Sequence, residues 1–341
     1  MKNQKFNIDF IKNKKIYFAI SLGIIAIGLI FNIIFGTQLS IKFTGGAIVK
    51  YSYQGDIDQN SLESVIQTAT TKDTVSIQIS SDIISNSDGQ HNNNVSVQFP
   101  GNQAIDTETQ TALNQALKDN FPDNNFALTE SNSVDPTNGK TFFMKCLFAV
   151  FLAAVLMVIY VAFRFRKIGG WSAGVMAVVA LLHDVAIIYF TFVILRMPID
   201  DNFIAVSLMI LGYSLNDTVV IYDRIRENRK LMGTKYTTTE IVNKSLNQTF
   251  VRTINTSITT AAAIGTVLVV ALLFNLSSVV SFALPMLVGV VVGCYSSVCV
   301  ASPLWVMWQN KKESNLKAQQ EAQQAQKAAK KAKNKKKKNS K

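Results

Sequence analysis

Asp217 has the clearest capacity for chemistry in this sequence, because it lies inside an apolar run long enough to cross a membrane. Tyr213 and Ser214 precede it by four and three residues, which places all three on one face of a helix. A charged group at the centre of a bilayer costs at least ~2.5 kcal/mol. A neutral asparagine could bond neighbouring helices at lower cost. The sequence therefore favours a proton-carrying role for Asp217 over a purely structural one.

A polar stripe follows near the start of the next apolar run, and Asn216 flanks Asp217 itself. Burial favours a protonated carboxyl group, whereas a nearby cation favours its ionised form, so small movements between the stripe and Asp217 could load and release a proton. For Thr259, Thr260 and the nearby Ser257, bonding between helices is an equally good interpretation. The stripe consists of Arg252, Asn255, Thr256, Thr259 and Thr260, at helical spacings of i, +3, +4, +7 and +8.

His183 and Asp184 are a second polar pair inside an apolar run. Counting ~1.5 Å per residue from Trp171 places Asp184 roughly 20 Å along its run, and the same count from Phe203 places Asp217 roughly 21 Å along its own. Both carboxyl groups are therefore expected near the centre of a hydrocarbon core roughly 30 Å thick. The pair has two interpretations, a buried structural dyad or a further part of a proton pathway.

Composition identifies the elements that position these residues as membrane spans. The chain has 341 residues, of which 48% are hydrophobic and only 16% charged, with a mean hydropathy of +0.21 and a net charge of +12. A soluble domain carries about 25% charged residues, so a soluble nucleic-acid binder and a disordered chain are both excluded. The three cysteines lie inside apolar runs, and we expect no disulfide framework, no metal site and no cofactor.

Six apolar runs predict six transmembrane helices of about 20 residues or more. The last belongs to a longer run from residue 278, in which we expect a lead-in segment before Pro285 and then one helix. The first run has no cleavage site after it and is expected to be an uncleaved anchor. The predicted domains are an N-terminal segment 1–15, a first span 16–36, an outer domain 37–140, a bundle 141–308 and a basic tail 309–341, with the later spans at 142–163, 171–195, 203–223, 257–276 and 282–308.

The distribution of charge predicts the orientation. Residues 37–140 carry a net charge of −7, whereas residues 1–15, 164–167, 224–256 and 311–341 carry +4, +3, +5 and +10. Six alternating spans place all the basic segments on one side, which the positive-inside rule makes cytoplasmic. We therefore expect a multi-pass protein of the cytoplasmic membrane with both termini inside. The lysine-rich tail is either simply solvated or in contact with anionic lipid or ribosomal RNA.

The acidic outer segment is long enough for a small domain. The β-α-β-β-α-β order of its predicted elements is typical of a ferredoxin-like α+β fold. Gly45-Gly46 predicts a bulge or a close approach of two backbones. Alternation and helical spacing predict a strand at Ser40–Tyr53, a helix at Asp58–Ala69, a strand at Thr74–Ser80, a loop at Ser85–Asn94, a strand at Val95–Phe99, a helix at Ala104–Phe121 and a strand at Phe126–Glu130.

Five stretches of the sequence resemble the SecF family, the smaller membrane subunits of the bacterial SecD–SecF complex of protein export. They also follow one another in the order of the family. The outer domain matches only weakly, and the lysine-rich tail belongs to no motif. The stretches are Ile41–Gly46, Leu182–Asp184, Ile210–Asn228, Asn243–Thr260 and Gly293–Leu304.

The resemblance implies a membrane α-helical fold, a six-span half-transporter bundle of the resistance-nodulation-division superfamily with an extracytoplasmic ferredoxin-like domain after the first span. It implies a subunit without enzymatic activity that pairs with a separate SecD among membrane lipids and couples proton flow to late steps of preprotein export. The SecYEG channel and the SecA motor would be wider partners. Asp217 and Arg252 resemble the proton-pathway pair of the family, and we expect Asn216, Thr256, Thr259, Thr260 and Asp184 in the same pathway.

Two other functions compete with export. An intramembrane aspartyl protease needs two carboxyl groups near the midplane, and Asp184 and Asp217 satisfy that depth. However, the sequence contains no Gly-x-Gly-Asp motif, and Asp223 falls at the edge of its span. A stand-alone exporter of small molecules or lipids from the same superfamily usually has two six-span halves, whereas this sequence contains one.

Overall fold

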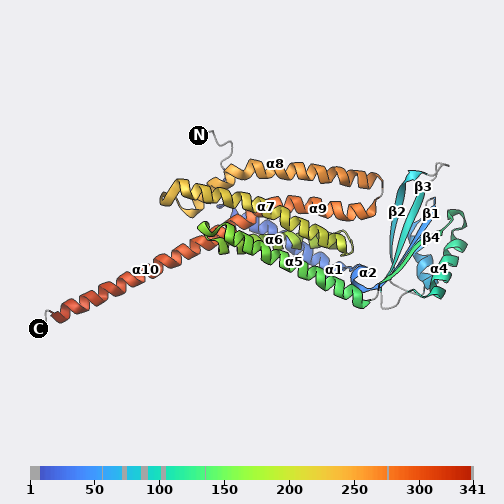
Figure 1. The fold of residues 1–341 in the computed structure, drawn as a ribbon, viewed down its shortest axis with the longest axis horizontal. Helices are drawn as coiled ribbons and strands as arrows, with labels where there is room; N and C mark the ends of the chain where they lie inside the picture. Colours follow the sequence, from blue (N-terminus) through green and yellow to red (C-terminus); the bar gives the residue numbers. More distant parts are fainter. Residues whose placement is uncertain are drawn as a thin grey trace.

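The computed structural model describes residues 8–55, 57–70, 75–85, 91–100, 105–134, 136–274 and 276–338. Six of the helices in these ranges are long and apolar enough to cross a membrane. The long helices form a bundle with the sheet domain at one end, and the described chain begins and ends toward the other end (Figure 1). This arrangement confirms the predicted fold class of a membrane helical bundle with a small α+β domain.

The bounds of the elements are as follows. The helices are α1 (Lys14–Phe35), α2 (Ile41–Thr44), α3 (Gln59–Thr70), α4 (Thr107–Asn120), α5 (Pro136–Arg164), α6 (Gly170–Ile194), α7 (Asp201–Met232), α8 (Thr238–Leu273), α9 (Ser277–Ser296) and α10 (Ser302–Lys338). The strands are β1 (Gly46–Gln54), β2 (Ser76–Ser85), β3 (His91–Pro100) and β4 (Ala127–Val134). A π-helical turn, Ser297–Ala301, joins α9 to α10.

The sheet domain has the predicted order of elements, β1-α3-β2-β3-α4-β4. Its four antiparallel strands lie in the order β2-β3-β1-β4, as in a ferredoxin-like fold. Alternate residues of β1 and β3, such as Val49 and Val97, are fully buried against Leu62 of α3 and Leu113 of α4. Packing of one sheet face against two helices therefore holds the domain together, as expected for a domain without cysteine.

Two local predictions for this domain are wrong. Ser40–Thr44 does not extend the first strand but forms the single turn α2, because the Ser40 side chain caps its start and Gly45 ends it with φ +83°. The expected loop Ser85–Asn94 is in part a strand, since β3 begins at His91 and Asn94 pairs with Ser52. Residues 86–90 of that loop lie outside the described ranges. Backbone pairing alone extends β3, because polar side chains do not prevent it.

The close backbone approach expected at Gly45-Gly46 is confirmed at Gly46. Its φ is +138°, and a Cβ there would lie 2.2 Å from the carbonyl oxygen of Phe99. We predict that Gly46→Ala speeds limited proteolysis of the sheet domain in the full-length protein by about tenfold, because about 1.4 kcal/mol of pairing between β1 and β3 is lost. Gly36→Ala is the control, since Gly36 also has a positive φ but no described atom within 4 Å of the new Cβ. Equal digestion of both variants would contradict the prediction.

The last span differs from its prediction. The segment before Pro285 is helical from Ser277 onward, so Pro285 lies inside α9 rather than at its start. Proline removes one backbone hydrogen bond, but membrane helices tolerate it because neighbouring helices compensate for the loss. The chain then continues through the π-helical turn into α10, which runs on to Lys338 and leaves the bundle (Figure 1).

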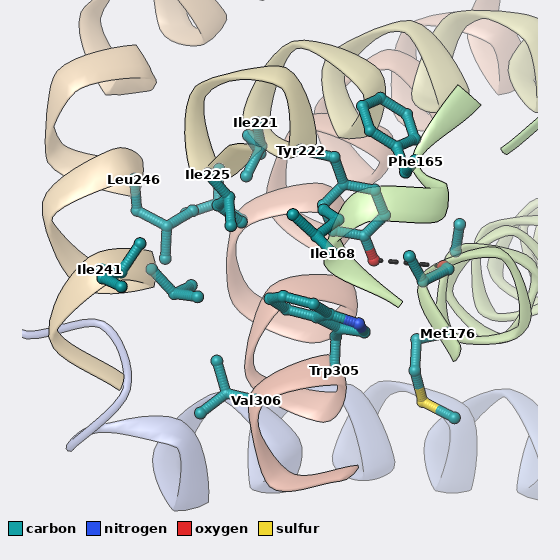
Figure 2. Close-up of a cluster of buried hydrophobic side chains, with 14 of the residues drawn as sticks. Phe165, Ile168, Met176, Ile221, Tyr222, Ile225, Ile241, Leu246, Trp305 and Val306 are labelled. Carbon is teal, nitrogen blue, oxygen red and sulfur yellow. Dashed lines mark hydrogen bonds between the residues drawn. The ribbon is translucent and has the colours of Figure 1, made fainter. Parts of the chain in front are cut away.

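A cluster of buried side chains closes the end of the bundle away from the sheet. Figure 2 shows Trp305 of α10 packed among side chains of α6, α7 and α8. The Trp305 ring lies 5.8 Å from that of Tyr222, centroid to centroid, and its Nε1 donates to Ser172 Oγ at 3.2 Å. We call this set the basal cluster; its buried members include Phe10, Phe165, Ile168, Tyr222, Ile225, Leu246, Trp305 and Val306.

Two further sets of contacts hold the ends of the bundle. At the basal end, Asn247 of α8 bonds the backbone nitrogen and oxygen of Ile8, each at 2.8 Å, and Asn243 accepts from the Phe10 nitrogen at 2.9 Å. At the sheet end, Ser40 donates its backbone N–H to Ile199 O at 3.0 Å. Lys42 and Asp201 also form an ion pair at 2.7 Å between the base of the sheet domain and α7.

Candidate functional site

Asp217 lies on the inner side of α7. The residue is 4% exposed, and its Oδ2 has no hydrogen-bond partner among the described residues. Arg252 of the neighbouring helix α8 is close enough to interact electrostatically with the Asp217 carboxyl group. The structure thus brings together the two residues that the sequence placed at the centre of a proton pathway.

The other predicted pathway residues are arranged differently. Asn216 is exposed, on a different face of α7 from the buried Asp217. Thr256 and Thr259 donate their hydroxyls to carbonyls of their own helix, those of Arg252 at 2.9 Å and Asn255 at 3.0 Å. Among the described residues, the recorded hydrogen bonds of these two threonines therefore stay within α8. Thr260 is partly buried on α8.

The stripe lies on a side of α8 that the described residues leave partly uncovered, as they do much of this helix. Arg252, Asn255 and Thr259 are exposed, and Thr256 and Thr260 are partly buried. The contact between α7 and α8 is instead made beside the stripe, where the Tyr213 hydroxyl donates to Ser257 Oγ at 3.1 Å. Hydrocarbon supplies no hydrogen-bond partners, so polar side chains that face outward from a membrane bundle are costly in lipid.

Asp184 is the most completely buried carboxylic acid of the described bundle, with 0% exposure. Its Oδ2 accepts hydrogen bonds from Ser214 Oγ of α7 at 2.7 Å and from Ser296 Oγ of α9 at 2.8 Å. Its Oδ1 lies 3.1 Å from Nδ1 of His183. One carboxyl group therefore joins α6, α7 and α9 at the middle of the bundle.

Glycines allow the helices to approach closely at this junction. A Cβ at Gly289 would lie 2.6 Å from Cγ1 of Ile210, and a Cβ at Gly293 would lie 3.1 Å from Cβ of Ser214. Two glycines four residues apart are a common means of close helix packing in membranes. Here they bring Ser296 of α9 within reach of Asp184.

Two hydroxyls continue the junction along α7. Ser297, the first residue of the π-helical turn, donates to the carbonyl of Ser214 at 3.1 Å, and Thr218 donates to Ser297 Oγ at 3.0 Å. Sequence reasoning missed Ser296 and Ser297. The detectable signal was a pair of adjacent hydroxyl residues one turn after Gly293, inside an otherwise apolar run.

The two central carboxyl groups have different partners. Asp184 is bonded to serines and His183, whereas Asp217 interacts with Arg252. These contacts do not join Asp184 and Asp217 as the pair of carboxyl groups that an aspartyl protease requires. Asp223 makes a third set of contacts, because it forms ion pairs with Arg164 and Arg226 at 2.8 and 2.7 Å.

Comparison with known proteins identifies the family. Residues 112–311 match the family model described as "Protein export membrane protein SecD/SecF, C-terminal". The chain is 31% identical over 298 residues to protein translocase subunit SecF of Sebaldella termitidis, covering 87% of this chain and 91% of that one. It is 32% identical over 313 residues to protein translocase subunit SecDF of Bacillus subtilis, covering 91% of this chain and 39% of that one.

A solved structure gives the same result. The crystal structure of SecDF, a translocon-associated membrane protein from Thermus thermophilus, matches with a TM-score of 0.72 at 29% identity. The match covers 91% of this chain and 40% of that one. The chain thus spans about two fifths of the SecDF proteins and nearly the whole of the Sebaldella SecF. From its motifs, its bundle and these relatives, the chain belongs to the SecD/SecF family of protein export membrane proteins.

Proposed function

We propose that this chain is a SecF-type subunit that acts with a SecD-type partner in the cytoplasmic membrane and couples proton flow to late steps of preprotein export. The SecYEG channel, the SecA motor and the preprotein would be its wider partners. The observation that carries the proposal is Asp217, a carboxyl group buried at the middle of α7 whose Oδ2 lacks a described partner and which interacts with Arg252 of α8.

The electrostatic interaction between Asp217 and Arg252 is suited to reversible proton binding. An ionised carboxylate is attracted to the guanidinium, whereas a protonated one loses most of that attraction. Each change of protonation therefore changes the force between α7 and α8. A proton driven through the site by the gradient can in this way move one helix against the other.

The uncovered stripe on α8 supports a partner beside this site. Arg252, Asn255 and Thr259 are exposed on this chain, and polar groups that face lipid are costly. A SecD-type subunit packed there would cover the stripe and supply groups for the proton pathway. The SecDF relatives support this reading, because they carry SecD and SecF parts in one chain.

The distribution of charge supports one orientation in the membrane. The described chain begins and ends toward the basal end of the bundle, where the segments around 164–167 and 224–235 are basic, and the sheet domain lies at the opposite end (Figure 1). By the positive-inside rule the basal end would be cytoplasmic and the sheet domain would face outward. There it would meet the emerging preprotein or the outer domain of its partner.

Gradient-dependent release of preprotein tests this function. Inverted membrane vesicles are loaded with a preprotein by the ATP-driven motor, ATP is then removed, and a proton gradient is applied with or without an uncoupler. We expect the gradient to complete transport only in vesicles that contain this chain together with its partner. A response to the gradient that is equal with and without the chain would refute the proposal.

A further inference from the structure

His183 and Asp184 form a buried pair that leaves one titratable atom without a partner. Asp184 is fully buried and the His183 side chain is 8% exposed. Nε2 of His183 is buried and has no hydrogen-bond partner in the part of the chain that the structure describes. We propose that this pair is a second proton-binding site of the bundle, separate from Asp217, and that Nε2 is the atom that accepts and releases the proton.

The hydrogen bonds of Asp184 fix the roles of the two ring nitrogens. Ser214 and Ser296 direct their hydroxyls at Oδ2, and Nδ1 of His183 faces Oδ1. An ionised carboxylate only accepts hydrogen bonds, so the two serine hydroxyls that donate to Asp184 match its ionised form. The ring proton of a neutral His183 is then held on Nδ1, and Nε2 keeps its lone pair.

The free Nε2 distinguishes this pair from a structural dyad. A buried polar atom left without a partner costs about 1–3 kcal/mol, and a histidine kept only for packing is expected to bond through both nitrogens. A proton on Nε2 turns the neutral ring into an imidazolium beside the carboxylate. The pair then changes from a net charge of −1 to no net charge, and releasing the proton to water reverses the step.

The side chains that face the pair are neutral at ordinary pH. Ser214 of α7 and Ser296 of α9 bond Asp184, and the ring of Tyr295 lies 6.4 Å from that of His183. The titratable groups that interact with Tyr295 are Tyr17 of α1 and Cys299 of the π-helical turn, both weak acids. The Tyr295 hydroxyl donates to the Tyr17 carbonyl at 2.6 Å. These described neighbours therefore add no charge of their own beside the His183 ring.

Proton binding at this pair would alter the packing of α7 near Asp217. Asp184 bonds Ser214, which precedes Asp217 by three residues on α7, and Ser297 bonds the Ser214 carbonyl. Loading His183 withdraws charge from the carboxylate that holds α7 to α9 and so weakens its bonds to Ser214 and Ser296. This use of the proton rests on the proposed function, whereas proton binding at His183 can be measured without it.

The chain contains only two histidines, His91 of the sheet domain and His183, which makes the test direct. The full-length His91→Gln protein, labelled with 15N-histidine and placed in lipid nanodiscs, gives ring signals from His183 alone. We expect 15N NMR to show the Nδ1–H tautomer at about pH 9 and the imidazolium as the pH falls toward about 5. A ring that stays neutral across this range, or that carries its proton on Nε2, would overturn the proposal.

Two variants in the same background sharpen the result. At the pH where His183 is half imidazolium, Asp184→Asn is expected to lower that fraction at least about fivefold, because the neighbouring negative charge is lost. Asp217→Asn is expected to leave the imidazolium signal in place, which shows that the two sites are separate. Loss of the signal in Asp217→Asn would overturn the second site. Failure of the vesicle assay alone would instead refute the proposed function and leave the NMR result unaffected.

Discussion

Asp217→Asn is expected to leave the protein folded and assembled but to abolish gradient-driven release of preprotein. Asparagine has nearly the shape of aspartate but cannot ionise, so it cannot carry a proton through the site. In the loaded vesicles described above, release by the variant should fall to the level of vesicles without the chain. Reporter export that remains gradient-dependent in a strain with no other copy would contradict this role.

Stability separates the loss of function from a loss of fold. Asp217 is 4% exposed and its Oδ2 lacks a hydrogen-bond partner among the described residues. The neutral variant therefore removes a buried charge without breaking a described hydrogen bond of Oδ2. We therefore expect its thermal midpoint to equal or exceed that of the parent protein. Asp201→Asn is the matched control, because Asp201 begins the same helix and its ion pair with Lys42 is about half exposed. Such a pair contributes about 0–1 kcal/mol, and release should be unaffected.

Arg252 provides the second half of this experiment. Arg252→Met removes the cation that interacts with Asp217, whereas Arg252→Lys keeps a cation on the same helix. Release should fail in the methionine variant and be retained in part in the lysine variant. Because the two groups act as a unit, the double variant Asp217→Asn, Arg252→Met should be no worse than either single variant. Additive losses would indicate that the two residues act independently.

These central residues could be predicted because a buried charge is conspicuous in an apolar sequence. Asp217 and Asp184 are visible against their apolar runs without any knowledge of packing, and Arg252 begins the polar stripe just before the next run. The order of the sheet domain was predictable for a related reason. Sequence periodicity indicates which face of each strand and helix is buried. The strand alternates around Val95 and Val97, and the helix has Leu113 and Leu117 one turn apart.

What could not be predicted depends on contacts between distant segments. The strand character of residues 91–94 comes from pairing with β1, and the helix across Pro285 depends on neighbouring helices. Ser296 meets Asp184 only because Gly289 and Gly293 let α9 approach α7. A hydroxyl inside an apolar run is common in membrane helices, so neither serine stands out until its partner is known.

The N-terminal segment illustrates the same limit. Nothing in the sequence pairs Ile8 and Phe10 with Asn247 and Asn243, which follow them by more than 230 residues. The structure shows that these bonds tie the start of the chain to α8 beside the basal cluster. The cluster therefore fixes the basal halves of α7 and α8, the helices that carry Asp217 and Arg252.

Trp305→Ala is expected to cause the largest loss of stability of any single truncation in the bundle. Trp305 is fully buried and packs against Tyr222 (Figure 2). Its removal leaves a large cavity and takes away the hydrogen bond that Nε1 donates to Ser172. Truncation of such a side chain costs about 3–5 kcal/mol, which corresponds to a fall of about 10 °C in the thermal midpoint. Trp305→Phe keeps a ring but loses the N–H, and its thermal midpoint should fall between those of the parent protein and Trp305→Ala.

Trp308 is the matched control, because it lies three residues further along the same helix and is 50% exposed. Trp308→Ala should change the unfolding free energy by no more than about 0.5 kcal/mol. The two variants are compared as purified protein in detergent, by thermal unfolding and by proteolysis of the N-terminal segment. Only Trp305→Ala should speed cleavage near Phe10, because Phe10 is packed in the basal cluster that the cavity loosens. Equal midpoints for the two variants would show that the basal cluster does not hold this end of the bundle together.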